Sequence, residues 1–116
     1  IVGPVISERC KPELRNHTIE TAGILNKAGV PMCICTDHPV VPEQYLPLSA
    51  GLAVRGGLDR DEALKAITIY PAQITGIADR VGSIEVGKDA DIVIFSGDPL
   101  SVCDTPDMVI VNGTVI

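Results

Sequence analysis

A near-continuous apolar stretch spans residues 30–36, Val-Pro-Met-Cys-Ile-Cys-Thr, and it predicts a strand buried on both faces. Ile1-Val2 predict the tail of an earlier strand, which Gly3-Pro4 ends. Between the two, residues 18–27 carry apolar side chains at helical spacing, and Gly29 supplies a stop. Strand, helix and strand in this order predict a βαβ unit in a parallel sheet or barrel.

The middle of the chain predicts loop and helix in alternation. Residues 37–47 contain three prolines and predict a loop, and residues 48–55 predict a short helix closed by two glycines. Asp59 is a suitable N-cap for a helix running to about Ile69, with Glu62 at the third helical position as in a capping box. Pro71 then predicts the first position of a further short helix, which ends at Gly76.

From about residue 77 the pattern changes to glycine, aspartate and β-branched residues. Ile92–Phe95 predict one strand. Met108–Val111 and Thr114–Ile116 flank Asn112-Gly113, which is the strongest short hairpin signal. The last forty residues therefore predict a small β module.

Composition narrows the possible functions. The chain has 116 residues, is 46% hydrophobic and contains only two Tyr and one Phe, which indicates one modest domain with an aliphatic core. The formal net charge is −6 and the basic residues are scattered, which argues against binding to nucleic acid or to an anionic membrane. No apolar run is long enough for a membrane span, and no signal peptide is visible.

The cysteines and the chain ends bear on the compartment and on completeness. Cys10, Cys33, Cys35 and Cys103 form no disulfide framework, so we expect a reducing cytoplasm. The chain opens at Ile1 without Met and stops directly after a hairpin. We expect it to be a piece of a longer protein whose missing part lies on the N-terminal side.

Asp37 is the first candidate for chemistry. It follows the apolar strand directly, and in α/β proteins ligand-binding and catalytic groups collect at the carboxyl ends of buried strands. A metal ion or a catalytic proton would give this carboxylate a partner. The alternative is a turn or helix-capping aspartate, since Asp-x-Pro is common turn chemistry.

Three segments resemble the metal-dependent amidohydrolase superfamily. Thr36-Asp37 is similar to the acid that ends the eighth strand of that family's barrel. The second segment is the helical stretch with Asp61-Glu62-Ala63-Leu64 and Thr68-x-x-Pro71-Ala72, and the third and most specific is the ordered run from Gly82 to Val93. Together the three segments cover about residues 18–116. Within the superfamily, they are most similar to the imidazolonepropionase-like and related branches.

The resemblance implies an α/β fold: the last strand–helix units of a (β/α)8 TIM barrel over residues 1–76, followed by part of a composite β-sandwich over residues 77–116. It implies a hydrolase that cleaves C–N bonds in cyclic amides, imidazolones or peptide-like substrates by metal-activated water. Asp37 would be both metal ligand and proton shuttle. One or two divalent ions, zinc above all, are implied. The family's His-x-His pair is absent, so we expect the 116-residue chain alone to be inactive.

The neighbours of Asp37 leave alternatives open. His38 could line the substrate pocket, pack against its own loop or lie in solvent. Cys33 and Cys35 share a face with Asp37 if the strand alternates regularly, and buried reduced thiols are favoured over a Cys-x-Cys metal site. His17 precedes a predicted helix and suits a cap or a solvent position.

Other residues favour structural roles. Asp89 and Asp91 fall in the family's turn into the β-sandwich, away from the metal. Tyr70 departs from the asparagine that the family often has there, so Thr68 or the backbone would have to cap the next helix.

Two functional hypotheses follow. The first is the hydrolase fragment, which would bind a small-molecule substrate, would require the missing N-terminal part of its parent and would oligomerise because it exposes apolar strand edges and helix faces. The second is a non-enzymatic α/β module with Asp37 as a capping residue. A stable, metal-free monomer in solution would favour the second.

Overall fold

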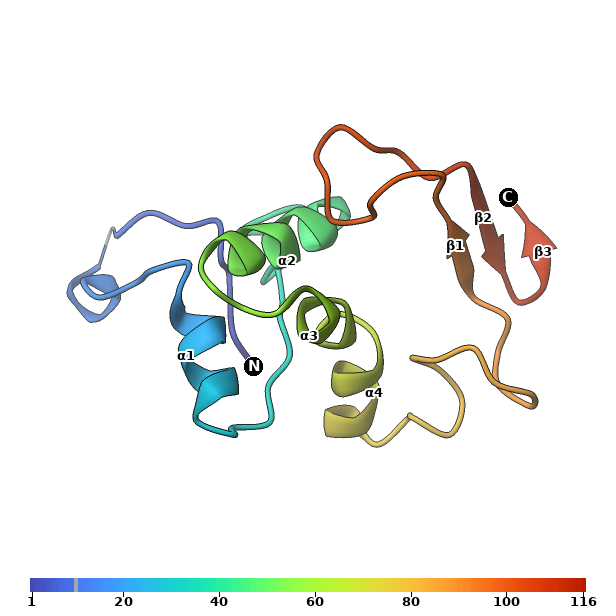
Figure 1. Cartoon of the computed structure of the whole chain (residues 1–116), viewed down its shortest axis with the longest axis horizontal. Coiled ribbons are helices and arrows are strands. Elements are labelled where there is room, and N and C mark those ends of the chain that lie inside the picture. The colour runs from blue at the N-terminus through green and yellow to red at the C-terminus, as the bar shows by residue number, and fades with distance from the viewer. Residues whose placement is uncertain (10) are drawn as a thin grey trace.

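The computed structural model describes residues 1–9 and 11–116. Helices occupy the first two thirds of the chain and a small sheet the last part (Figure 1). The α-helices are α1 (Thr21–Lys27), α2 (Leu46–Arg55), α3 (Arg60–Lys65) and α4 (Ile69–Thr75), with 3₁₀ turns η1 (Pro12–Leu14) and η2 (Glu43–Tyr45). The strands are β1 (Ile92–Ile94), β2 (Met108–Val111) and β3 (Thr114–Val115). The arrangement is mixed α and β, as predicted.

The predicted βαβ unit is present, but its strands are reduced to one bridge. Val2 and Ile34 form a parallel bridge, with Val2 N–H donating to Cys33 O at 2.8 Å and Cys35 N–H to Val2 O at 2.9 Å. The prediction of a strand over the whole of residues 30–36 is therefore wrong in extent, because the pairing is limited to the bridge at Ile34. Pro31 has no N–H to give a ladder, and the Ile34 N–H donates to Ala66 O at 2.9 Å instead of to a strand.

The helices pack through very small side chains. Ala50, Ala53, Ala63 and Ala66 are completely buried, and they share a core with Val5, Met32, Ile34 and Leu58. The core is aliphatic, as the composition predicts. Small residues allow helix backbones to approach closely: a Cβ on Gly23 would lie 2.9 Å from the backbone of Gly57.

Helix boundaries differ from the predictions at several ends. α1 begins at Thr21 instead of Thr18, because the Thr18 hydroxyl accepts from the Glu20 N–H and its carbonyl accepts from the Thr21 hydroxyl. α3 ends at Lys65, well before Ile69. α4 begins at Ile69, so Pro71 is its third residue and not its first. Gly76, in the left-handed conformation (φ 76°), ends α4 as predicted.

The β module is an antiparallel sheet in the order β1-β2-β3. Asn112 (φ 49°) and Gly113 (φ 77°) form the predicted hairpin turn, in which both central residues are left-handed. The Asp91 carboxylate accepts from the Asn112 N–H at 2.8 Å. Asp91 therefore fixes this turn, in agreement with its predicted structural role.

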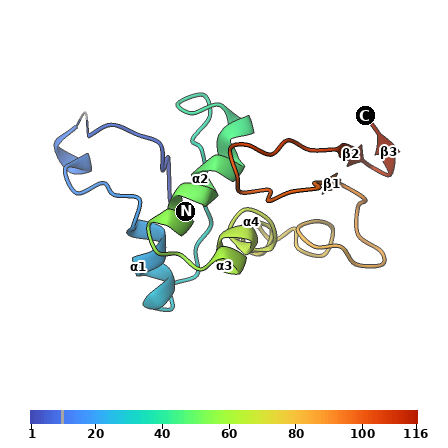
Figure 2. The same ribbon diagram turned by 45° about the horizontal axis from the view of Figure 1, so that its top comes forward.

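The strands lie to one side of the helices in both views (Figures 1 and 2). Two segments connect the parts: residues 76–91 and the loop between β1 and β2, which runs back towards α2. No helix in the described ranges is long and apolar enough to cross a membrane.

Candidate functional site

Asp37 lies at the carboxyl end of the parallel pair. The segment before it is buried, with Met32 and Ile34 each 3% exposed and Thr36 7% exposed. Asp37 itself is exposed. The change from buried strand to exposed acid occurs at the place where the sequence predicts a functional carboxylate.

The backbone at Asp37 is left-handed, with φ 56°. The Val40 N–H donates to Asp37 O at 2.8 Å and closes a tight turn over residues 37–40. Aspartate tolerates this conformation better than most residues, so the turn geometry agrees with the turn-residue alternative as well. Because Asp37 leaves the extended conformation, strand alternation does not place it on one face with Cys33 and Cys35, and that expectation is wrong.

The end of the first strand lies directly beside the second. A Cβ on Gly3 would be 2.1 Å from Cys35 O and 2.8 Å from Cys35 Sγ, and Gly3 has φ 154°. Glycine is therefore required for the two strands to end side by side. This close contact sets where the segment leading to Asp37 emerges.

The other candidate residues form no metal site with Asp37 among the described residues. His38 is exposed in the same turn. Cys33 is buried, Cys35 half-buried and Cys103 exposed, and all three are free thiols. Across the described ranges, no three His, Cys, Asp or Glu side chains group to hold a metal ion. Cys10 lies outside the described residues.

His17 has a structural contact instead of a helix-capping one. Its Nε2 lies 3.0 Å from Pro4 O, and since a carbonyl can only accept, Nε2 carries the hydrogen. The Arg9 Nε in turn donates to His17 O at 3.0 Å. His17 thus ties the loop after the first strand to the approach to α1.

A polar cluster that the sequence did not predict surrounds Glu62. Its Oε1 accepts from Lys65 Nζ at 2.8 Å, and its Oε2 accepts from Tyr70 Oη at 2.8 Å and from Asn26 Nδ2 at 3.1 Å.

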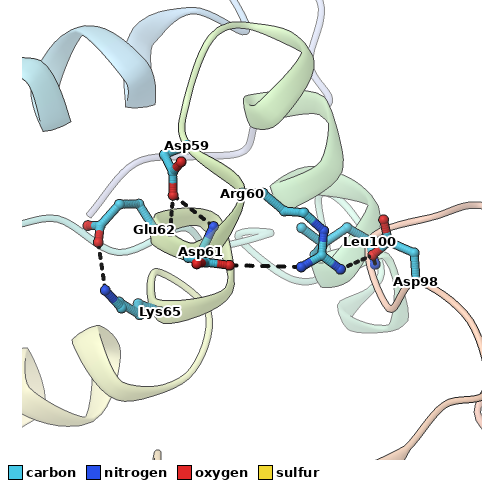
Figure 3. Close-up of polar contacts among 7 residues, drawn as sticks. All are labelled: Asp59, Arg60, Asp61, Glu62, Lys65, Asp98 and Leu100. Carbon is cyan, nitrogen blue, oxygen red and sulfur yellow. Dashed lines mark hydrogen bonds and ion pairs between the residues drawn. The ribbon is translucent and has the colours of Figure 1, made fainter.

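Of the predicted capping box at the start of α3, the Asp59 half is present and the Glu62 half is not. Asp59 accepts from the Asp61 and Glu62 N–H groups (Figure 3), but the Glu62 side chain turns away to this cluster. Tyr70 does not cap α4, and neither does the Thr68 side chain.

The hydrogen bonds of the Glu62 cluster shift the pKa values of its acid, its lysine and its tyrosine. Hydrogen bonds from Lys65 first and Tyr70 second lower the pKa of the Glu62 carboxyl. The same contact with Glu62 raises the pKa of Tyr70 and that of Lys65. Asn26, Glu62 and Tyr70 of the cluster line a pocket of about 420 Å³ beside residues 29–32, at the amino end of the second strand. It lies at the end of that strand opposite to Asp37.

Asp89 also has a structural partner. Its carboxylate pairs with Arg80, and its N–H donates to Arg80 O at 2.8 Å. The pair closes the loop that contains Gly87, which agrees with the structural role expected for Asp89.

The sequence of this chain matches the model of one protein family over nearly its whole length. The family model described as "Amidohydrolase family" matches residues 5–116. An amidohydrolase, tasK, of Hapsidospora irregularis is 35% identical over 104 residues, which is 90% of this chain and 11% of that protein. An imidazolonepropionase of Thermoplasma acidophilum is 41% identical over 70 residues, which is 59% of this chain and 17% of that protein.

Among solved structures, an amidohydrolase from Thermotoga maritima MSB8 is similar over the whole of this chain. It is 40% identical with a TM-score of 0.95, and the match covers 30% of that chain. This chain therefore spans less than a third of each of these three proteins.

Proposed function

Since the chain belongs to the amidohydrolase family, we propose that it is part of a hydrolase that cleaves carbon–nitrogen bonds, with Asp37 at the reacting centre. The observation that carries the proposal is the position of Asp37. It is an exposed carboxylate at the carboxyl end of two parallel strands, fixed by a closed turn. Active sites of α/β barrels lie at this end of the strands.

Asp37 fits a divalent metal by the chemistry of its donor atoms. Carboxylate oxygens bind zinc and harder divalent ions. No three possible ligands group together among the described residues, so the remaining ligands for one or two ions, zinc in first place, would come from elsewhere in the protein. A bound ion would supply Lewis-acid activation of water.

Asp37 would then carry the proton of the reaction. Its carboxylate would help to hold the ion, and it would accept a proton from the attacking water and give it to the leaving nitrogen. Asp37 is exposed, and none of the side-chain contacts among the described residues holds its carboxylate, which leaves it available to both partners.

His38 is proposed as a substrate contact. It is exposed and follows Asp37 in the same turn, so it borders the same end of the strands. The names of relatives support a substrate with an imidazolone ring, and cyclic amides and peptide-like amides remain within the same class of bond. A neutral imidazole could donate to or accept from such a group.

The division into domains is part of the proposal. Residues 1–76 would be the last strand–helix units of a (β/α)8 barrel, supported by the parallel bridge and the helices that pack on it. Residues 77–116 would be part of a β-sandwich, supported by the antiparallel sheet. The rest of the barrel would come from the parent protein.

The test is Asp37→Asn in the full-length protein, assayed on imidazolone, cyclic-amide and dipeptide substrates with zinc content measured in parallel. We expect turnover to fall by about 10²–10⁴-fold while the fold is retained. The control is Asp79→Asn, an identical exchange at an exposed position near Arg80. Undiminished turnover in Asp37→Asn would contradict the role, and a protein without metal or turnover would favour a non-enzymatic module.

A further inference from the structure

The loop between β1 and β2 inserts a side chain into the helical core. Leu100 is 8% exposed and belongs to the same buried cluster as Ala50 and Ala53 of α2. Val102, two residues further along the loop, is 74% exposed. A residue of the β module is therefore part of the core of the helices, although the strands themselves lie apart from them (Figure 2).

α2 carries a glycine where the loop touches it. A Cβ on Gly51 would lie 2.5 Å from the Leu100 carbonyl oxygen, a backbone atom that cannot rotate away. Glycine weakens the interior of a helix relative to alanine. Its presence in the middle of α2 thus makes room for the loop backbone.

A charged contact fixes the same loop to α3. The Arg60 Nη2 lies 2.7 Å from Asp98 Oδ1 (Figure 3). The same oxygen accepts from the Leu100 N–H at 2.9 Å, so one carboxylate holds both the arginine and the backbone that presents Leu100. The Asp98 N–H donates to the Asp104 carboxylate at 3.2 Å, which closes the loop on its other side.

We propose that α2 and the start of α3 form a docking surface whose partner is the segment Asp98–Leu100 of the same chain, and that this contact couples the β module to the helices. Leu100 supplies apolar burial, and Gly51 supplies the space for the backbone. Arg60 and Asp98 hold the loop in register with α3, because the oxygen that contacts Arg60 also accepts from the Leu100 N–H.

The first experiment is amide hydrogen exchange and limited proteolysis of the full-length protein with Leu100→Ala. We expect cleavage within residues 96–104 to accelerate by about tenfold or more, because truncating a buried leucine favours the open state that a protease cuts. β1 and β2 should lose protection while α1 and α3 keep theirs. Val102→Ala, in the same loop but exposed, is the matched control. Equal cleavage rates in the two variants would overturn the proposal.

Gly51→Ala gives a second, independent test in case Leu100→Ala unfolds the whole protein. Alanine should favour α2 as a helix, yet its Cβ should displace Leu100 and expose the loop to protease. The proposal is overturned if Gly51→Ala leaves loop cleavage at the wild-type rate.

A double-mutant cycle tests the ion pair. Asp98→Asn and Arg60→Gln should each accelerate loop cleavage, and the double variant should be no faster than the faster single variant, because the two side chains act through one contact. Multiplicative effects of the two changes would show that the pair does not hold the loop.

Discussion

The Tyr70 hydroxyl donates to the Glu62 carboxylate at 2.8 Å and joins α4 to α3. The same carboxylate accepts from Asn26 of α1, so one acid connects three helices. These residues surround the amino end of the second strand, and Asp37 lies at its carboxyl end. The Glu62 cluster is therefore a structural centre, separate from the proposed reacting centre.

Tyr70→Phe should destabilise the fold by about 1 kcal/mol, because it removes a hydrogen bond to a charged group that is partly open to solvent. Urea unfolding measures the change. Tyr45→Phe is the matched control, since Tyr45 is 45% exposed and its hydroxyl is in none of the hydrogen bonds of the described residues. Equal stability of the two variants would show that the Glu62–Tyr70 contact contributes nothing.

The Glu62 cluster should make stability depend on acid pH. In the folded state the pKa of Glu62 is below its ordinary value of 4.5, with Lys65 as the largest cause. Its contribution is then fully present above pH 4.5 and is lost as the pH falls through the lower folded value. The difference in unfolding free energy between wild type and Glu62→Gln should shrink in that acid range. A difference that stays constant down to the lowest pH would contradict this assignment.

Asp59→Ala should cost about 1 kcal/mol through loss of the N-cap of α3. Asp59→Ser should restore most of that stability, because a serine hydroxyl can accept from the same N–H groups. Thermal unfolding of both variants is the measurement. If serine is no better than alanine, the cap does not operate through its side-chain acceptor.

Gly3→Ala and Gly29→Ala should differ strongly, although both glycines have positive φ. Gly29 (φ 71°) has nothing within 4 Å of an added Cβ, so alanine there costs about 1–2 kcal/mol of backbone strain alone. At Gly3 the Cβ would also meet Cys35 O at 2.1 Å. We expect unfolded or much less stable protein for Gly3→Ala, measured by circular dichroism and urea titration, and similar losses would contradict the close contact.

Asp37→Gly should stabilise the fold by about 0.5–1 kcal/mol, because glycine adopts φ 56° without strain. Under the proposed function the same variant should lose turnover. Calorimetry of the full-length protein measures the first effect and the substrate assay the second. A glycine variant less stable than wild type would show that the Asp37 carboxylate has a structural partner.

Local signals predicted the parts whose cause is local. Asp59 as an N-cap, Gly76 as a helix stop and Asn112-Gly113 as a hairpin turn depend on the conformations open to a few adjacent residues. The end of α3 at Lys65 and the start of α4 at Ile69 were not predicted, because no glycine or proline lies between the two positions.

Contacts between distant residues had no signal in the sequence. Asn26 and Glu62 are 36 positions apart, and Arg60 and Asp98 are 38 apart. The predicted capping box would have the Glu62 side chain contact the backbone at the start of α3. Instead, its carboxylate accepts from three side-chain donors on α1, α3 and α4. The left-handed turn at Asp37 likewise replaced the regular alternation that would have aligned it with Cys35.

The sequence by itself determined the order of the elements, the aliphatic character of the core, and Asp37 as the acid that follows a buried strand, since each depends on neighbouring residues and on composition. Only the tertiary structure decided that Gly3 must be glycine, that Glu62 joins three helices, and that Leu100 of the β module enters the helical core. The physical reason is that these features arise from the close approach of distant segments, which no local preference encodes.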